Sequence, residues 1–199
     1  MRKKGFFICL EGLDGSGKTT QAKLLAKRLK KTYDAVYTAE PSNGKIGRFI
    51  KRYCLNAEKR TSSILEALLF AADRFEHVEN GVLPAIDKGR LVISDRYIYS
   101  SLAYQGAAGV DLAWIDKINE CAISPDLAIF IDALPEAVVN RLKPRRSVME
   151  NLETQRKVRQ LYLKFVNEGK LVLIDGNASK EEVADDILKV VLGFLEKGC

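Results

Sequence analysis

The stretch Gly12-Leu-Asp-Gly-Ser-Gly-Lys-Thr19 (GLDGSGKT) decides the fold of this 199-residue chain, because it matches the phosphate-binding pattern G-x-x-x-x-G-K-[ST] at every position. An apolar run, Gly5–Glu11, precedes it, and a segment of helical period, Lys18–Lys31, follows it. Glycines let the backbone N–H groups of such a loop converge on an anion, and the following helix adds its unpaired N–H groups and its positive end. The stretch therefore predicts a nucleotide-phosphate site rather than a glycine-rich turn without a ligand.

Each position of this loop has an expected contact. Lys18 is expected to reach the β- and γ-phosphates of the nucleotide, and the Thr19 hydroxyl is expected to be a ligand of Mg²⁺, which prefers hard oxygen donors. The predicted ATP-binding residues are Gly12, Leu13, Asp14, Gly15, Ser16, Gly17, Lys18, Thr19 and Thr20.

Five short apolar runs alternate with stretches of helical period, and this order predicts a parallel sheet built from β-α units. The runs are Gly5–Glu11, Ala35–Thr38, Arg90–Asp95, Leu127–Asp132 and Leu171–Asp175. Their nearly continuous apolar character is expected of strands with helices on both faces. The predicted fold is a three-layer α/β P-loop NTPase fold with a five-stranded parallel sheet flanked by helices.

Local signals divide this chain into elements but not into domains. Ser63-Ile-Leu-Glu66 reads as a capping box that opens a helix running to about Asn80, and Ser179-Lys-Glu-Glu182 as one that opens the last helix. No internal repeat and no Pro/Gly-rich linker interrupts the sequence. Residues 1–199 are therefore expected to form a single domain.

The composition, 47% hydrophobic and 29% charged, is that of a globular protein and excludes a disordered chain. The net charge of +6 suits nucleic acid, acidic lipid or a polyphosphate ligand and does not choose among them. Four scattered cysteines without a C-x-x-C pair predict reduced thiols, and the apolar run Phe6–Leu10 is too short for a signal peptide or a membrane span. We expect a cytoplasmic protein with neither a membrane nor a nucleic-acid partner.

Three predicted strands end in aspartate, at the sheet edge where ligands bind in open parallel sheets. Asp95 is favoured as a catalytic and metal-binding residue because Arg96, whose guanidinium can hold phosphate oxygens in a bidentate grip, follows it. For Asp132 and Asp175, capping of the following turn is the alternative.

Two helical segments offer groups for a second substrate. Phe70 and Arg74 are four residues apart, which places an aromatic face beside a forked donor. Ser101 and Gln105, and likewise Ser100 and Tyr104, share faces of the segment after Arg96, and an amide can read the edge of a base. The spacing alone leaves open that Phe70 is a core residue, that Arg74 lies on the surface, and that the later helix is simply amphipathic.

P-loops also serve GTPase switches. This chain has no N-K-x-D for guanine recognition, and its only D-x-x-G is Asp14–Gly17, inside the loop itself. These observations favour a small-molecule kinase, whose acceptor could be a nucleoside, a nucleotide or another metabolite.

Five ordered motifs resemble those of the thymidylate kinase family: EGLDGSGKTTQ, Glu40-Pro41, LLFAADR, DRYIYSSLAYQG and PDLAIFID. The resemblance extends from the first strand to the final Ile-Asp-Gly. It implies transfer of the γ-phosphate of ATP to dTMP with Mg²⁺, on the route to dTTP, by a homodimer. A kinase of another nucleoside or nucleoside monophosphate remains the alternative.

The resemblance also assigns acceptor residues. The expected dTMP-binding residues are Asp14, Glu40, Arg48, Lys51, Phe70, Arg74, Arg96, Ser100, Ser101, Tyr104 and Gln105. Phe70 would stack on thymine, while Arg74 and Gln105 would contact the base. Arg96 would hold the acceptor or transferred phosphate, and Tyr104 would lie under the deoxyribose, where a 2′-hydroxyl would clash.

Gly15 stands where one branch of the family has an arginine, and basic lid residues compensate in the other branch. The lid, at about residues 141–150, would then bring Arg145 and Arg146 over the γ-phosphate and exclude water, although a solvated surface cluster is the alternative. The expected catalytic residues are Lys18, Asp95, Arg96, Arg145 and Arg146, and the expected metal ligands are Thr19 and Asp95.

The chain departs from the family pattern in two places. Bacterial members usually read R-E-P-G-G-T where this chain has Ala39-Glu-Pro-Ser-Asn-Gly44, and Lys51 stands where an arginine for the acceptor phosphate often occurs. Arg48, one turn earlier, is the alternative to Lys51. The lid reads Arg146-Ser-Val-Met-Glu150 in place of the usual D-R-x-E.

Overall fold

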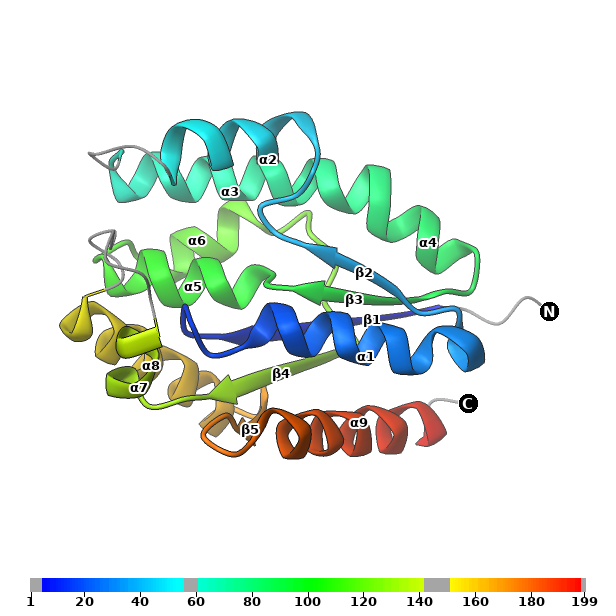
Figure 1. Ribbon diagram of the computed structural model, residues 1–199. Coiled ribbons are helices and arrows are strands. Elements are labelled where there is room, and N and C mark those ends of the chain that lie inside the picture. Colours follow the sequence, from blue (N-terminus) through cyan, green and yellow to red (C-terminus); the bar gives the residue numbers. More distant parts are fainter. Residues whose placement is uncertain (1–4, 56–60, 142–150, 198–199) are drawn as a thin grey trace.

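The computed structural model describes residues 5–55, 61–141 and 151–197 of the chain. In these residues, five strands form one sheet of order β2-β3-β1-β4-β5, and all neighbouring strands are parallel (Figure 1). The strands are β1 (Phe6–Gly12), β2 (Val36–Ala39), β3 (Leu91–Asp95), β4 (Leu127–Asp132) and β5 (Val172–Asp175). The predicted parallel sheet is confirmed, with each strand starting or ending within a residue of its apolar run.

Helices cover both faces of this sheet. The helices are α1 (Lys18–Tyr33), α2 (Lys45–Phe49), α3 (Ser63–His77), α4 (Leu83–Asp87), α5 (Ile98–Ala107), α6 (Leu112–Ile118), α7 (Pro135–Arg141), α8 (Leu152–Asn167) and α9 (Lys180–Lys197). Two π-helical turns, η1 (Ile50–Cys54) and η2 (Val78–Val82), continue α2 and α3. No helix in the described ranges is both long and apolar enough to cross a membrane.

Alternate residues of the central strands point to opposite faces and so build two cores. Phe7 of β1 and Phe130 of β4 pack with apolar side chains of α5, α6 and α8. Ile8 and Ile129, their neighbours along the strands, pack against α1 and α9. This alternation explains why the strands are apolar throughout, and it confirms the three-layer α/β architecture.

One of the two predicted capping boxes is confirmed and the other is shifted. Ser179 and Glu182 exchange hydrogen bonds of 2.9 and 3.3 Å between backbone N–H and side chain, as a capping box requires. Ser62, not Ser63, caps α3, because its extended backbone lets the hydroxyl accept from the Leu65 N–H at 3.2 Å. The prediction was wrong by one residue, since adjacent serines give the same sequence signal.

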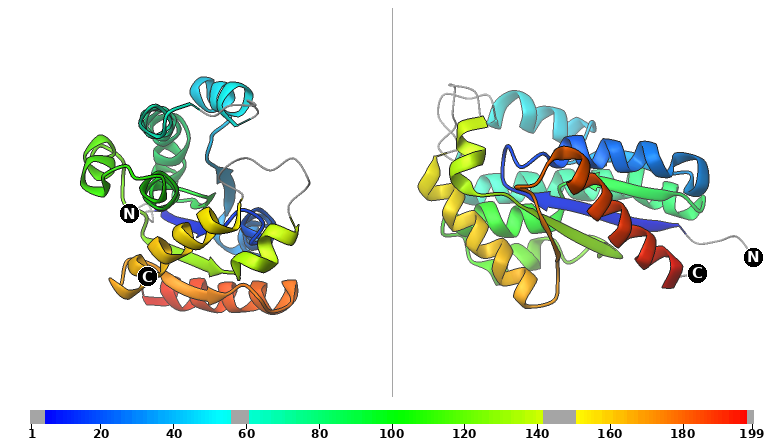
Figure 2. Two further views of the ribbon diagram at one scale, coloured as in Figure 1. Left: turned by 90° about the vertical axis from the view of Figure 1, so that its left-hand side faces the viewer. Right: turned by 60° about the horizontal axis from the view of Figure 1, so that its bottom comes forward.

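The carboxyl ends of the strands meet at one edge of the sheet, which Figure 2 (left) shows from the end. The chain crosses from β3 on one side of β1 to β4 on the other, so this edge contains the topological switch point where ligands bind in open α/β sheets. The loop 13–17 leaves β1 at this point.

Candidate active site

The loop between β1 and α1 has the backbone that its glycines predict. Gly15 and Gly17 have φ of 86° and 93°, in the left-handed region that glycine adopts without strain. A Cβ on Gly12 would lie 2.8 Å from the Ile131 carbonyl oxygen, so the close approach of β4 also requires glycine there. No side chain of a described residue caps the N-terminus of α1, whose first N–H groups face the loop. Backbone N–H groups in this arrangement suit an anion.

Lys18 lies buried in this loop, with 5% of its surface exposed. Its Nζ donates to the Leu13 carbonyl oxygen at 2.6 Å. Burial, followed by the positive charge of Arg96, lowers the pKa of Lys18 to about 8, although nearby carboxylates oppose the shift. An anionic partner such as a phosphate would stabilise this buried ammonium group.

Thr19 and Asp95 come together at the start of α1. The Thr19 hydroxyl donates to the Asp95 carboxylate, to which Tyr37 of β2 also bonds. Burial, followed by the Asp95 charge, raises the pKa of Tyr37 to about 12. Two hard oxygen ligands beside Lys18 fit Mg²⁺, which commonly takes one or two protein oxygens and completes its shell with phosphates and water.

Arg96 lies between β3 and α5, and its side chain contacts both the phosphate loop and α5. Its backbone has φ of 74°, rare for a residue other than glycine. Its guanidinium pairs with the Asp14 carboxylate, donates to Ser100 Oγ at 2.9 Å and lies 5.1 Å from the centre of the Tyr104 ring. The Tyr104 hydroxyl in turn accepts from the Asp14 N–H at 2.9 Å. Burial opposes the charge of Arg96, but Asp14 and its other neighbours outweigh it and hold the pKa well above its usual range.

A cavity of about 190 Å³ opens beside Arg96. Its lining residues are Asp14, Glu40, Pro41, Leu55, Phe70, Arg74, Arg96, Tyr97, Ser100, Ser101, Tyr104 and Gln105. All the expected acceptor residues except Arg48 and Lys51 are in this set. The structure therefore brings residues from the loop, the end of β2, α3 and α5 around one space.

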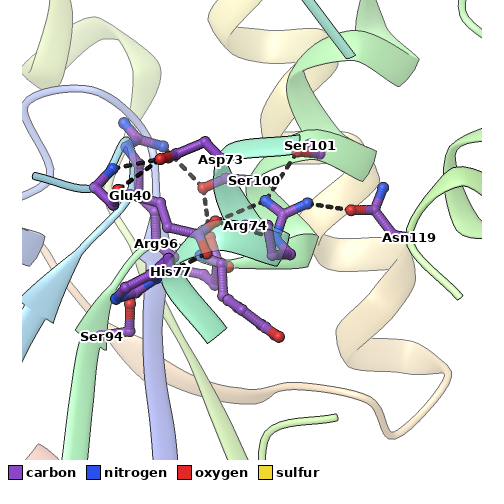
Figure 3. A network of polar contacts seen from close by, with 12 residues as sticks. Glu40, Asp73, Arg74, His77, Ser94, Arg96, Ser100, Ser101 and Asn119 are labelled. Atoms are coloured by element: carbon purple, nitrogen blue, oxygen red, sulfur yellow. Dashed lines mark hydrogen bonds and ion pairs between the residues drawn. The ribbon is translucent and has the colours of Figure 1, made fainter. Parts of the chain in front are cut away.

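Arg74 is fixed at the base of this cavity, with 1% of its surface exposed (Figure 3). Its Nε and Nη2 both donate to Glu40 Oε2, at 3.0 and 2.8 Å, and Nη1 donates to Asn119 Oδ1 at 2.6 Å. Nη2 also donates to Ser101 Oγ at 3.1 Å, while His77 contacts the other Glu40 oxygen at 3.2 Å. The alternative that Arg74 is a surface residue is excluded by its burial, and half-buried Phe70 faces the same cavity.

Arg48 and Lys51 do not reach this cavity. Arg48 donates to the Asn43 carbonyl oxygen at 2.6 Å, and Lys51 donates to Asn43 Oδ1 at 3.0 Å. Both line a separate, more open hollow that they share with Ser42 and His77. Neither side chain is among those that line the cavity beside Arg96.

The remaining predicted residues are the two other strand-end aspartates, which have partners in the structure, and the lid arginines. Asp132 accepts a forked pair of hydrogen bonds from Arg159 of α8, at 2.6 and 2.8 Å, whereas Asp175 accepts from the Asn177 N–H at 2.9 Å and so caps its turn. Arg145 and Arg146, with most of the expected lid, lie outside the described residues.

Sequence reasoning did not name Pro41, Leu55 and Tyr97 as residues of the cavity wall. It also missed Glu11, a buried carboxylate beside the site. Glu11, at the end of β1, is fully buried and bonds to Ser100 and to Tyr162 of α8. A signal was present, because a carboxylate that ends a strand buried on both faces needs partners. Its partner Tyr162, 151 positions away in the chain, had no signal at all.

The chain was compared with known proteins. The family model described as thymidylate kinase matches residues 10–187. A probable thymidylate kinase of Pyrococcus abyssi is 47% identical over 197 residues, covering 94% of this chain and 96% of the relative. Those of Pyrobaculum aerophilum and Staphylothermus marinus are 42% and 40% identical, covering 93% and 96% of this chain and 95% and 96% of the relatives. The chain belongs to the thymidylate kinase family.

Proposed function

We propose that this protein transfers the γ-phosphate of ATP to dTMP, giving ADP and dTDP in the formation of dTTP. One observation carries the proposal: Arg96 pairs with Asp14 of the phosphate loop, and both residues line the adjoining cavity. A donor phosphate on the loop and an acceptor in the cavity would therefore meet at one guanidinium. A GTPase switch needs no such second site.

The reaction requires positioning and charge neutralisation more than covalent help from the protein. An oxygen of the acceptor phosphate would attack the γ-phosphorus while the bond to the β-γ bridging oxygen breaks. Lys18 and the N-terminus of α1 would hold the donor phosphates, and Arg96 would neutralise charge on the transferred group. Mg²⁺ bound through Thr19 and Asp95 would add positive charge at the phosphate oxygens.

The cavity suits a pyrimidine nucleotide. The Phe70 ring offers a stacking face. Gln105 is 2% exposed, and its side chain, which makes no hydrogen bond to any described residue, offers a donor and an acceptor for a base edge. Tyr104 is fixed by Asp14 and Arg96 and would lie against the sugar. Arg96, which lines the cavity, is the proposed contact of the acceptor phosphate. Arg145 and Arg146 are the proposed contacts of the γ-phosphate.

We expect dTMP to be the best acceptor in a coupled assay of ADP release with dTMP, dUMP, UMP, AMP and thymidine. UMP should be at least tenfold worse in kcat/KM, since a sugar lying against the fixed Tyr104 ring would bring its 2′-hydroxyl into a clash with that ring. The matched comparison of dUMP with UMP isolates that hydroxyl. A better rate with another monophosphate, or with thymidine, would refute dTMP as the substrate.

A second copy of the chain is the proposed partner, and α3 carries the surface for it. Ile64, Leu68 and Phe75 form an apolar stripe on the side of α3 away from the cavity, with 56%, 44% and 44% of their surfaces exposed. Leu68 and Phe75 line a groove with Ile118, the last residue of α6, and with Ala122, which follows that helix. An apolar stripe beside an apolar groove on one face suits a self-complementary, two-fold interface.

The reaction's use of ATP also supports the expected cytoplasmic location.

Leu68→Glu should convert the protein from dimer to monomer, because it places a charge in the apolar interface core. Light scattering coupled to size-exclusion chromatography measures the mass directly. Leu173→Glu, at an exposed leucine of β5, is the matched control and should leave the mass unchanged. A Leu68→Glu protein that keeps the mass of two chains would place the interface elsewhere.

A further inference from the structure

Glu11 has its carboxylate fully occupied by groups next to Arg96. Its Oε1 accepts from the Tyr97 N–H at 2.8 Å. Its Oε2 accepts from Ser100 Oγ at 2.6 Å and from the Tyr162 hydroxyl at 3.0 Å. The side chain has no exposed surface and does not line the cavity, so it cannot touch a substrate there.

The first link from Glu11 to Arg96 is through the backbone. The left-handed conformation of Arg96 persists only if its surroundings fix it, because an L side chain disfavours this region. Its N–H donates to the Leu10 carbonyl oxygen at 2.9 Å, and its carbonyl oxygen accepts from Ser94 Oγ at 2.7 Å. The bond from the Tyr97 N–H to Glu11 holds the next peptide group, so Glu11 completes the restraint.

The second link runs through a side chain. A serine hydroxyl has one proton, and Ser100 donates that proton in its hydrogen bond to Glu11. The oxygen of Ser100 is then left to accept from Arg96 Nη1, at 2.9 Å. The carboxylate therefore sets the direction in which Ser100 holds one arm of the guanidinium, while Asp14 holds the other.

We propose that Glu11 is a positioning residue for Arg96, fixing its strained backbone through Tyr97 and its guanidinium through Ser100. The proposal rests on the proposed function, in which Arg96 neutralises the transferred phosphate. Positioning of this kind matters because a catalytic group must stay within a fraction of an ångström of its productive place.

The accepting role of Glu11 needs its ionised form, which burial disfavours. Burial raises the pKa of Glu11 from 4.5 to about 7, although the Ser100 hydrogen bond and the Arg96 charge lower it. Between about pH 4.5 and about pH 7, Glu11 is therefore protonated in the folded protein and ionised in the unfolded chain. The contribution of Glu11 to the free energy of unfolding therefore falls as the pH rises from about 4.5 to about 7.

The test is a double-mutant cycle on dTMP kinase activity. Glu11→Gln should lower kcat roughly 10- to 100-fold with little change in the KM for ATP. An amide has only one acceptor oxygen, so its NH2 group would face either the Tyr97 N–H or the hydroxyls of Ser100 and Tyr162. In an Arg96→Ala background the same change should cost less than threefold, since the group that it positions is absent. Asp126→Asn, which alters a carboxylate that holds the Phe7 N–H at the other end of β1, is the matched control.

Two results would overturn the proposal: an equal loss of kcat in both backgrounds, or no loss in either. A crystal structure of Glu11→Gln supplies a readout that needs no activity, and an unchanged Arg96 backbone and guanidinium would also count against it. Failure of the wild-type protein to phosphorylate dTMP would instead refute the proposed function and leave the crystallographic test standing.

The pH dependence of stability separates Glu11 from the other groups around it. The titratable and charged groups near its carboxylate are Cys9, Lys18, Arg96, Tyr97, Tyr99 and Tyr162. They are common to both proteins when wild type is compared with Glu11→Gln. The free energy of unfolding of wild type, relative to that of the variant, should decrease between pH 5 and pH 7 in urea titrations; a constant difference would contradict the burial of the carboxylate.

Discussion

Lys18→Met will lower kcat about a thousandfold, the size of loss seen when one buried donor to transition-state charge is removed. Lys18 is expected to contact the phosphate oxygens on which charge changes during transfer. Methionine retains most of the side-chain volume and removes a desolvated charge whose pKa burial already lowers to about 8. The fold should therefore survive, and steady-state kinetics with saturating ATP and dTMP measure the loss.

Lys27→Met is the control for this experiment. Lys27 lies on the same helix and is exposed, and its side chain makes no ion pair or hydrogen bond to a described residue. Its variant should match wild type in kcat and in thermal midpoint. A Lys18→Met enzyme that folds and retains more than a tenth of wild-type kcat would exclude Lys18 from the transfer step.

Arg96→Lys should also lower kcat about a thousandfold, although the charge is kept. The guanidinium reaches Asp14 and Ser100 with separate arms and lies against the Tyr104 ring, and a single ammonium cannot span these contacts. A lysine at this position would keep the positive charge but lose the forked geometry of the guanidinium, and the transferred phosphate would then be misplaced. Comparing kcat with the KM for dTMP shows whether the loss lies in the transfer step.

Arg90→Lys provides the matched control, because Arg90 also makes forked bonds to a carboxylate, that of Asp34, but at the surface. Exposed pairs of this kind contribute less than about 1 kcal/mol to stability. That variant should behave as wild type. If Arg96→Lys stays within tenfold of wild type, the fork of Arg96 is not needed for transfer.

The strands and the phosphate loop were predictable because their signals are local. Eight contiguous residues specify the loop, and their glycines adopt the backbone angles that the pattern implies. Apolar runs locate the strands because burial on both faces removes the polar alternation that would blur them. Even here the limit of a local signal is visible, since Ser62 and Ser63 look alike and only the folded backbone selects the cap.

The acceptor cavity was predictable only in part. Spacing placed Phe70 beside Arg74, but whether that pair faced a cavity, the core or solvent depended on how α3 packs against α5. The resemblance to a family supplied the remaining members and also named Arg48 and Lys51, which the structure holds on Asn43 in a neighbouring hollow.

The sequence alone determined that this protein binds a nucleotide phosphate on a parallel α/β sheet, because both features depend on neighbouring residues and on strand and helix period. Only the tertiary structure decided how Arg96 is held, because the residues around it come from three segments that meet through long-range packing: Glu11 and Asp14 from the end of β1 and its loop, Ser100 from α5, and Tyr162 from α8. Hydrogen-bond direction and burial, which set the pKa of Glu11 and the orientation of the Ser100 hydroxyl, exist only once those segments are together.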